Sequence, residues 1–166
     1  MKLVVGLGNF EPKYLKTRHN VGFIVLDTFS KKHTLDWKEE SKYKSLVCKY
    51  KDLLLAKPLT FMNRSGEAVS KILNYYKLNP EDLYVIHDDL DLPFGKIKKQ
   101  IGAGAAGHHG VEDVILKVGT KDFNRVRIGI GRPNQENIPP EDWVLLPLTD
   151  EELARIKDMD LLDLLS

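Results

Sequence analysis

Apolar residues recur along this chain in short runs, separated by stretches in which they follow a helical period. Short runs that are bounded by turn residues predict strands at Leu3–Leu7, Leu46–Tyr50, Leu53–Ala56, Leu83–Ile86, Lys96–Ile101 and Arg125–Ile130. Helical spacing predicts helices over about 20–32, from a cap at Ser65 to a stop at Asn79-Pro80, over about 109–118, and from about 150 onward. Lys51 and Asp52 separate the second and third strands and predict a hairpin turn.

Strands interleaved with helices indicate an α/β fold, namely a single-domain three-layer sandwich with a twisted, mixed and mostly parallel β-sheet flanked by helices. No internal repeat, low-complexity tract or Gly/Ser linker interrupts the chain, so we predict one domain over residues 1–166. Ligands of such folds bind beyond the carboxyl ends of the strands. Most of the polar clusters in this sequence fall in those loops.

Composition narrows the class of protein. Of the 166 residues, 42% are hydrophobic and 30% charged, as in ordinary globular domains. The single cysteine, Cys48, excludes a disulfide framework and a multi-cysteine zinc site. No stretch reaches the roughly 20 apolar residues of a membrane span, and Met1 leads directly into a predicted strand without a signal region. We therefore expect a cytoplasmic protein with no membrane partner.

The charge is unevenly distributed along the chain. The net charge is +1, but residues 149–166 hold six acidic and two basic side chains, which leaves 23 basic and 18 acidic ones in the rest. A basic body can attract phosphates, although a solvated surface of mixed charge is the default interpretation. The candidates for a phosphate track are Lys96, Lys98, Lys99, Arg125, Arg127 and Arg132.

His19 and the acidic cluster after the fourth predicted strand are the strongest candidates for catalysis. His19 precedes the first predicted helix, and Asp88, Asp89 and Asp91 follow the strand Leu83–Ile86. Alone, His19 is more simply a cap or a surface group. A neutral imidazole becomes an effective general base when a carboxylate orients its other nitrogen. Because the sequence has no Gly-x-Ser-x-Gly motif, hydrolysis at this site would use an activated water.

Two further motifs have competing interpretations. The run Gly6–Glu11 begins like a dinucleotide-binding loop but lacks its third glycine, which argues against a nucleotide-binding domain. Phe61 and Asn63 can belong to a helix lead-in, or can serve as a stacking platform and an amide donor.

Metal ligands are available at His87, Asp88, Asp89, Asp91, His108 and His109, but their spacing matches no closed site. We predict no metal and no cofactor.

Several blocks in one order resemble the bacterial peptidyl-tRNA hydrolases. They are Val5–Asn9, Tyr14, Thr17–Gly22, Thr60–Gly66, His87–Pro93, Gly107–Gly110 and Arg125–Gly131. The resemblance covers about 1–147, nearly the whole chain. It implies a metal-free esterase of α/β fold that cleaves the ester between a peptide and the 3′ ribose of tRNA, recycling tRNA from aborted translation. Nothing in the sequence demands more than a monomer, and we expect no obligate protein partner.

The resemblance also implies roles for individual residues. His19 would activate water, Asp88 would orient its ring, and Asn9 would contact the blocked end of the substrate and reject free aminoacyl-tRNA. Asn63 would bind the 3′ end or the scissile carbonyl, with Tyr14 and Phe61 as aromatic walls. His109 would contact substrate. Lys98 and Arg127, with the other bases of the track, would serve the phosphates of the acceptor stem.

The chain departs from the family pattern at three places. Phe10-Glu11 replaces the usual Pro-Gly, and His109 replaces an asparagine that helps to bind substrate and water. The chain ends at Ser166, whereas relatives commonly continue through a longer C-terminal helix.

The alternative function is a non-catalytic RNA-binding relative of the same fold. The joint presence of His19, Asp88, Asn9 and Asn63 argues against it.

Overall fold

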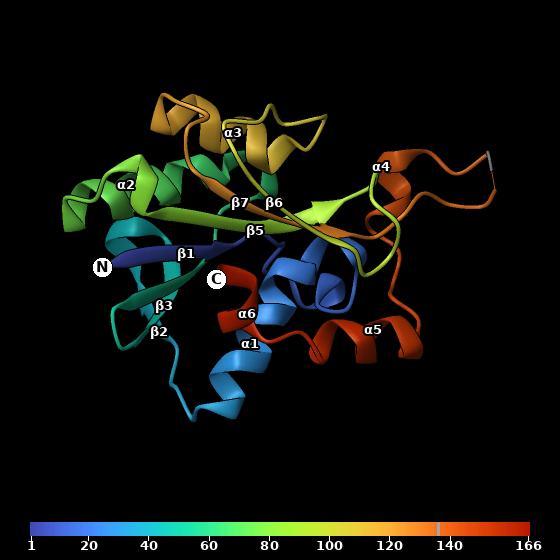
Figure 1. The fold of residues 1–166 in the computed structure, drawn as a ribbon, viewed down its shortest axis with the longest axis horizontal. Coiled ribbons are helices and arrows are strands. Elements are labelled where there is room, and N and C mark those ends of the chain that lie inside the picture. Colours follow the sequence, from blue (N-terminus) through green and yellow to red (C-terminus); the bar gives the residue numbers. More distant parts are fainter. Residues whose placement is uncertain (136) are drawn as a thin grey trace.

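The chain folds around one mixed β-sheet, described here from a computed structural model that covers residues 1–135 and 137–166. The strands lie in the order β2-β3-β4-β1-β5-β7-β6 (Figure 1). Their bounds are β1 Lys2–Gly6, β2 Lys38–Glu40, β3 Ser45–Tyr50, β4 Leu53–Pro58, β5 Leu83–Asp89, β6 Ile97–Ile101 and β7 Asn124–Gly129. The α-helices are α1 Val21–Lys32, α2 Ser65–Tyr76, α3 His109–Val118, α4 Pro140–Trp143, α5 Asp150–Lys157 and α6 Leu161–Leu165.

The centre of the sheet is parallel and its edges are antiparallel. β1 pairs in parallel with β4 and β5, and β5 with β7. β2 and β3 extend one edge and β6 the other, all in antiparallel pairing. The predicted mixed, mostly parallel sheet is confirmed.

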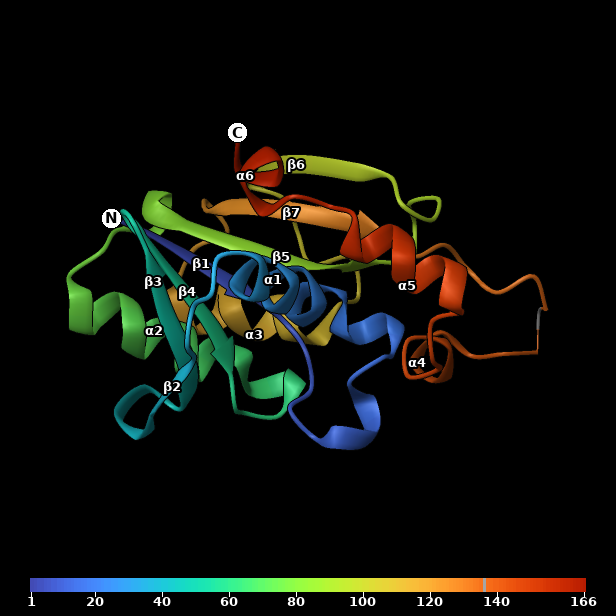
Figure 2. The same cartoon turned by 90° about the horizontal axis from the view of Figure 1, so that it is seen from below.

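Two hydrophobic cores separate the sheet from its covering helices. Along β1, Val4 packs into the core under α1, α5 and α6, whereas Leu3 and Val5 pack into the core under α2 and α3. Figure 1 shows these two groups of helices on opposite sides of the strands, and Figure 2 shows the same layers from below. This is the expected three-layer sandwich. The central strands read as continuous apolar runs because both of their faces are covered.

The direction of the connections reverses between β1 and β5. β1 leads into α1 on one face and onward to β4, whereas the chain after β5 reaches β7 through α3 on the other face. The carboxyl ends of two neighbouring strands with diverging connections leave a crevice, which is where open α/β sheets bind ligands. At this crevice, Asn9 and His108 lie in loops, His19 lies in a 3-10 turn, and Asp88 lies at the end of β5.

Three elements differ from the sequence prediction. The predicted C-terminal helix from about 150 is two helices, because the chain breaks at Asp158–Asp160 and turns Leu161 and Leu164 into the core beneath α1. β2 has the charged sequence Lys-Glu-Glu, which carries no apolar pattern, and was not predicted. Nor was the short helix α4. No helix within residues 1–135 and 137–166 has the length and apolar character that crossing a bilayer requires.

Gly22 lets the first helix approach the crevice closely. A Cβ atom at this position would lie 2.5 Å from the carbonyl oxygen of Ile86 and 2.8 Å from the backbone nitrogen of Leu7. Both are backbone atoms of the sheet region, which cannot rotate away as a side chain can. Gly22 therefore sets the distance between α1, which follows His19, and the end of β5.

We expect Gly22→Ala to lower the free energy of unfolding by about 1–3 kcal/mol, because overpacking forces backbone shifts. Chemical denaturation measures this loss. Gly104→Ala is the matched control, since a Cβ there meets no atom of the described residues within 4 Å. Equal stability of the two variants would show that the α1 contact yields without cost.

Candidate active site

A pocket of about 370 Å³ lies at the carboxyl ends of β1 and β5. Its polar lining includes Asn9, His19, Asn63, Asp88, His108 and His109. Apolar side chains such as Phe61, Leu90 and Val144 form the rest of its wall. A concave, largely apolar cavity with a few converging polar groups is the usual form of a small-molecule or catalytic site.

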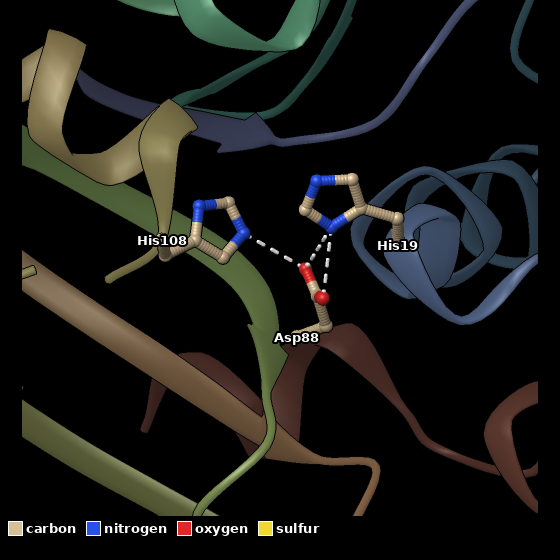
Figure 3. Close-up of side chains that lie close together, drawn as sticks. All are labelled: His19, Asp88 and His108. Atoms are coloured by element: carbon tan, nitrogen blue, oxygen red, sulfur yellow. Dashed lines mark hydrogen bonds and ion pairs between the residues drawn. The ribbon is translucent and has the colours of Figure 1, made fainter. Parts of the chain in front are cut away.

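Asp88 is the polar centre of this pocket. Its side chain is 2% exposed, and His19 Nδ1 lies 3.0 and 2.9 Å from the two carboxylate oxygens. Figure 3 shows both contacts, together with a third from His108 on the other side of the carboxylate. Since an ionised carboxylate only accepts hydrogen bonds, His19 Nδ1 carries the proton. The Nε2 atom of the neutral ring is then the free base.

His108 is the second histidine bound to Asp88. Its Nε2 donates to Asp88 Oδ1 at 2.8 Å, and its Nδ1 accepts from the backbone N–H of Val111 at 3.2 Å. This second bond caps the N-terminus of α3 and fixes the ring tautomer. The His19 and His108 ring centroids are 4.9 Å apart. Asp88 therefore holds one histidine from each side of the crevice.

The buried carboxylate and the two histidines shift the acidities of the site. Burial tends to raise the pKa of Asp88, but the charges and hydrogen bonds of His19 and His108 outweigh it and hold that pKa well below its ordinary value. Burial tends to lower the pKa of His19, but the charge and hydrogen bond of Asp88 outweigh it and raise that pKa. The pair therefore consists of a permanent anion and a strengthened imidazole base.

Asn9 presents the donor end of its amide. Asn20, which is fully buried, holds the Asn9 backbone from both sides: its Oδ1 accepts from Asn9 N–H at 2.7 Å, and its Nδ2 donates to Asn9 carbonyl oxygen at 2.9 Å. Asn9 Oδ1 accepts from the backbone N–H of Glu11 at 3.1 Å. With its oxygen engaged in this way, Asn9 offers the pocket two N–H donors.

Arg18 fastens the segment 143–147 beside His19. Its guanidinium lies 3.7 Å from the Trp143 ring centroid, donates to the carbonyl oxygens of Leu146 and Pro147, and pairs with Glu152 at 2.9 Å. The backbone N–H groups of Arg18 and His19 donate to the carbonyls of Leu146 and Val144. The Val144 side of the pocket wall is thus bound to the turn that carries His19.

The pocket lining also includes two buried polar residues, His87 and Arg125. His87 Nδ1 donates to the carbonyl oxygen of Asp88 at 2.8 Å, and burial, with the charges of His108 and Arg125, lowers its pKa well below the ordinary value. Arg125 donates to the carbonyl oxygens of Ala103 and Gly104, which fastens the glycine-rich loop to β7. Burial, then the neighbouring Arg127, lowers the pKa of Arg125 to about 10.

The structure brings together six of the nine site residues chosen from the sequence. Asn9, His19, Phe61, Asn63, Asp88 and His109 all line the pocket. His109 is exposed and pairs with Glu112 at 3.0 Å rather than with Asp88. Of the described residues that line the pocket, none is Tyr14, Lys98 or Arg127. Arg127 instead donates to Asp89 and to Gln100, and Lys98 is exposed on β6.

From the sequence, His108 was considered only as a candidate metal ligand and as a member of the block Gly107–Gly110, and Asn20 and Arg18 only as members of the block Thr17–Gly22. The predicted helix N-terminus at 109 was a further signal for His108, since the residue before it is in the capping position. Within the described residues, His19, Asp88 and His108 are also the one set whose donor atoms fit a metal ion, all lying within 4.8 Å of one another. Each of these donors is engaged in the hydrogen bonds above.

This chain is similar in sequence to a known family of enzymes. The family profile described as peptidyl-tRNA hydrolase matches residues 3–163. A peptidyl-tRNA hydrolase of Aliarcobacter butzleri is 46% identical over 160 residues, which cover 96% of this chain and 86% of the relative. One from Syntrophomonas wolfei is 44% identical, covering 95% and 86%.

A solved structure also resembles the fold. The crystal structure of peptidyl-tRNA hydrolase from Acinetobacter baumannii superposes with a TM-score of 0.85 at 32% identity, covering 94% of this chain and 81% of the other.

We expect Asp88→Asn to lower the pKa of His19 below its ordinary value near 6.5. The substitution removes the negative charge that stabilises the imidazolium, whereas the burial that opposes ionisation remains. Histidine ring resonances followed by NMR during a pH titration measure the change. Asp91→Asn is the control, since Asp91 is exposed and pairs with Arg132. A His19 pKa that is unchanged in Asp88→Asn would refute the electrostatic coupling.

Proposed function

Since the chain belongs to the peptidyl-tRNA hydrolase family, we propose that it cleaves the ester between a peptide and the 3′ ribose of tRNA by means of a water activated by His19. The observation that carries the proposal is the His19–Asp88 pair, with its free Nε2 in a pocket that also holds Asn9. The family relationship supplies the substrate, and the pair supplies the chemistry.

The reaction needs one base that later acts as an acid. His19 Nε2 removes a proton from water as the oxygen attacks the ester carbonyl, and Asp88 stabilises the imidazolium that forms. The tetrahedral intermediate then collapses, and the imidazolium returns the proton to the departing ribose oxygen. The products are a peptide carboxylate and a tRNA with a free hydroxyl.

Amide donors serve the rest of the substrate. Asn63 lies on the pocket wall and donates to the scissile carbonyl or the 3′ end, and Phe61 provides an aromatic wall beside it. Loss of oxyanion support of this kind costs about 2–4 kcal/mol in the barrier. The free N–H groups of Asn9 donate to the carbonyl of the blocked amine. A free aminoacyl-tRNA has an ammonium group there, which would face donors and require desolvation.

Contacts with the tRNA body extend beyond the pocket. Lys98 on β6 is an exposed cation that can meet backbone phosphates, and Tyr14 and His109 line the approach. Arg127 shares its charge with Asp89, so it contributes less. We propose a monomeric enzyme of a single domain. Because ribosomes produce the substrate, we place the activity in the cytoplasm.

We expect His19→Ala to lower kcat/KM at least a hundredfold, with tRNA affinity nearly unchanged, because it removes the general base. Release of N-acetyl-phenylalanine from its tRNA measures turnover, and filter binding measures affinity. His33→Ala is the matched control, a histidine at the end of α1 remote from the pocket. Cleavage is also expected to survive a chelator. Tight tRNA binding without release by the unaltered protein would instead indicate the RNA-binding alternative.

The pH profile of kcat/KM should report the same base. Because the pKa of His19 is raised above its ordinary value, protonation removes the lone pair as the pH falls through that raised pKa. We expect kcat/KM to fall about tenfold per pH unit below it and to level off above it. Stopped assays across pH 5–9 at constant ionic strength test this. A flat acidic limb would rule out His19 as the titrating base.

A further inference from the structure

A second groove adjoins the active-site pocket and has no role in the reaction described so far. This outer groove has a volume of about 350 Å³ and lies between the β2 edge and the segment that follows β4. Phe10, Glu40, Lys44, Thr60 and Phe61 are among its lining residues. Phe61 lines both cavities, so the pocket and the outer groove meet at its ring.

The meeting point is an aromatic pair. The rings of Phe10 and Phe61 have centroids 6.2 Å apart and are tilted by 42°. Their residues are 39% and 56% exposed, so the two rings present a contiguous apolar surface to solvent. Asn9 lines the pocket and its neighbour Phe10 lines the outer groove. A peptide that passes Asn9 on leaving the pocket therefore reaches the aromatic pair next.

An unsatisfied hydroxyl lies beyond the aromatic pair. Thr60 is 8% exposed and lines the outer groove, and its Oγ1 has no hydrogen-bond partner among the described residues. Because Oγ1 is itself buried, a group in the groove reaches it only when the Thr60 side chain rotates, and the cost of leaving the hydroxyl without a partner favours that rotation. A hydroxyl oxygen can accept a hydrogen bond from a peptide N–H.

The charged residues that line the outer groove are of both signs, and three of the five are in ion pairs. Glu67 pairs with Lys44 at 2.6 Å, and Glu40 pairs with Lys38 at 3.3 Å. Paired charges at a surface give a weak field, so the groove does not select its occupant mainly by charge. The outer groove therefore selects its occupant by shape and by contact with its aromatic rings.

We propose that the outer groove is the subsite for the second residue of the peptide, counted from the esterified end. Phe10 and Phe61 pack against the side chain of that residue, and Thr60 Oγ1 accepts its backbone N–H. The inference rests on the proposed function, since it requires Asn9 to bind the carbonyl of this same residue. It makes the enzyme selective for large apolar or aromatic second residues.

The test compares three substrates that share one tRNA and one esterified phenylalanine. N-acetyl-Phe-tRNA has no second residue, N-acetyl-Gly-Phe-tRNA has one without a side chain, and N-acetyl-Phe-Phe-tRNA fills the outer groove. We expect the unaltered enzyme to cleave the Phe-Phe substrate with a kcat/KM about five- to tenfold above the Gly-Phe substrate, mainly through KM. Phe10→Ala should abolish this preference and leave N-acetyl-Phe-tRNA unaffected.

A second variant tests the backbone contact. Thr60→Val keeps the shape of the side chain but removes the hydroxyl, so it should raise KM about threefold to tenfold for both dipeptide substrates and not for N-acetyl-Phe-tRNA. Tyr75→Ala is the matched control, because Tyr75 is an exposed aromatic residue of α2 outside the lining of both cavities as described. It should change none of the three reactions.

The outcomes separate the two proposals. Cleavage of N-acetyl-Phe-tRNA shows that each variant is folded and that the hydrolase activity holds. If the unaltered enzyme treats the Gly-Phe and Phe-Phe substrates alike, or if Phe10→Ala slows all three reactions equally, the subsite is overturned and the activity stands. If the unaltered enzyme cleaves none of the three, the proposed function fails, and the subsite fails with it.

Discussion

A buried carboxylate at the end of a central strand is the constraint on which the site depends. Asp88 is almost completely withdrawn from water, and an unpaired anion in that position would be costly. Its two partners, His19 and His108, enter from loops before α1 and α3, on opposite faces of the sheet. The crevice is therefore held together at its floor by the same ion that orients the base. The contacts that compensate the buried charge are thus the same contacts that orient the His19 ring.

The arrangement follows from strand topology. Because the connections from β1 and β5 diverge to opposite faces, the helices that follow them start on either side of the same strand end. Gly22 then permits α1 to approach the backbone at Ile86, which sets the reach of His19 toward Asp88. The short distance between His19 and Asp88 thus depends on the close backbone contact at Gly22, one helical turn away.

The sequence was sufficient where apolar patterning was strong. The periodicity predicted the buried central strands, the helices at 21–32 and 65–76, and the class of the sheet. Covered strands and amphipathic helices can be predicted in this way because their buried positions recur as a regular pattern of apolar residues. β2 escaped prediction because its three charged residues pair at a sheet edge without burying a face. The break before α6 escaped because its acidic residues continue the composition of α5. The role of His108 as a second hydrogen-bond partner of Asp88 was missed because this contact arises only from tertiary structure, across twenty residues of chain.

The fastening of the Val144 wall to the His19 turn has a consequence for how substrate and products move. The N–H of His19 donates to the carbonyl oxygen of Val144, while Arg18 is stacked on Trp143 and bonded to two further carbonyls. Swinging this wall outward would break several of these bonds together and would carry the base away from its carboxylate. The Val144 wall therefore does not open independently of the His19 turn. Phe61 and Asn63 are exposed residues of the pocket lining, so substrate can reach the pocket beside them while the Val144 wall stays bound to the His19 turn.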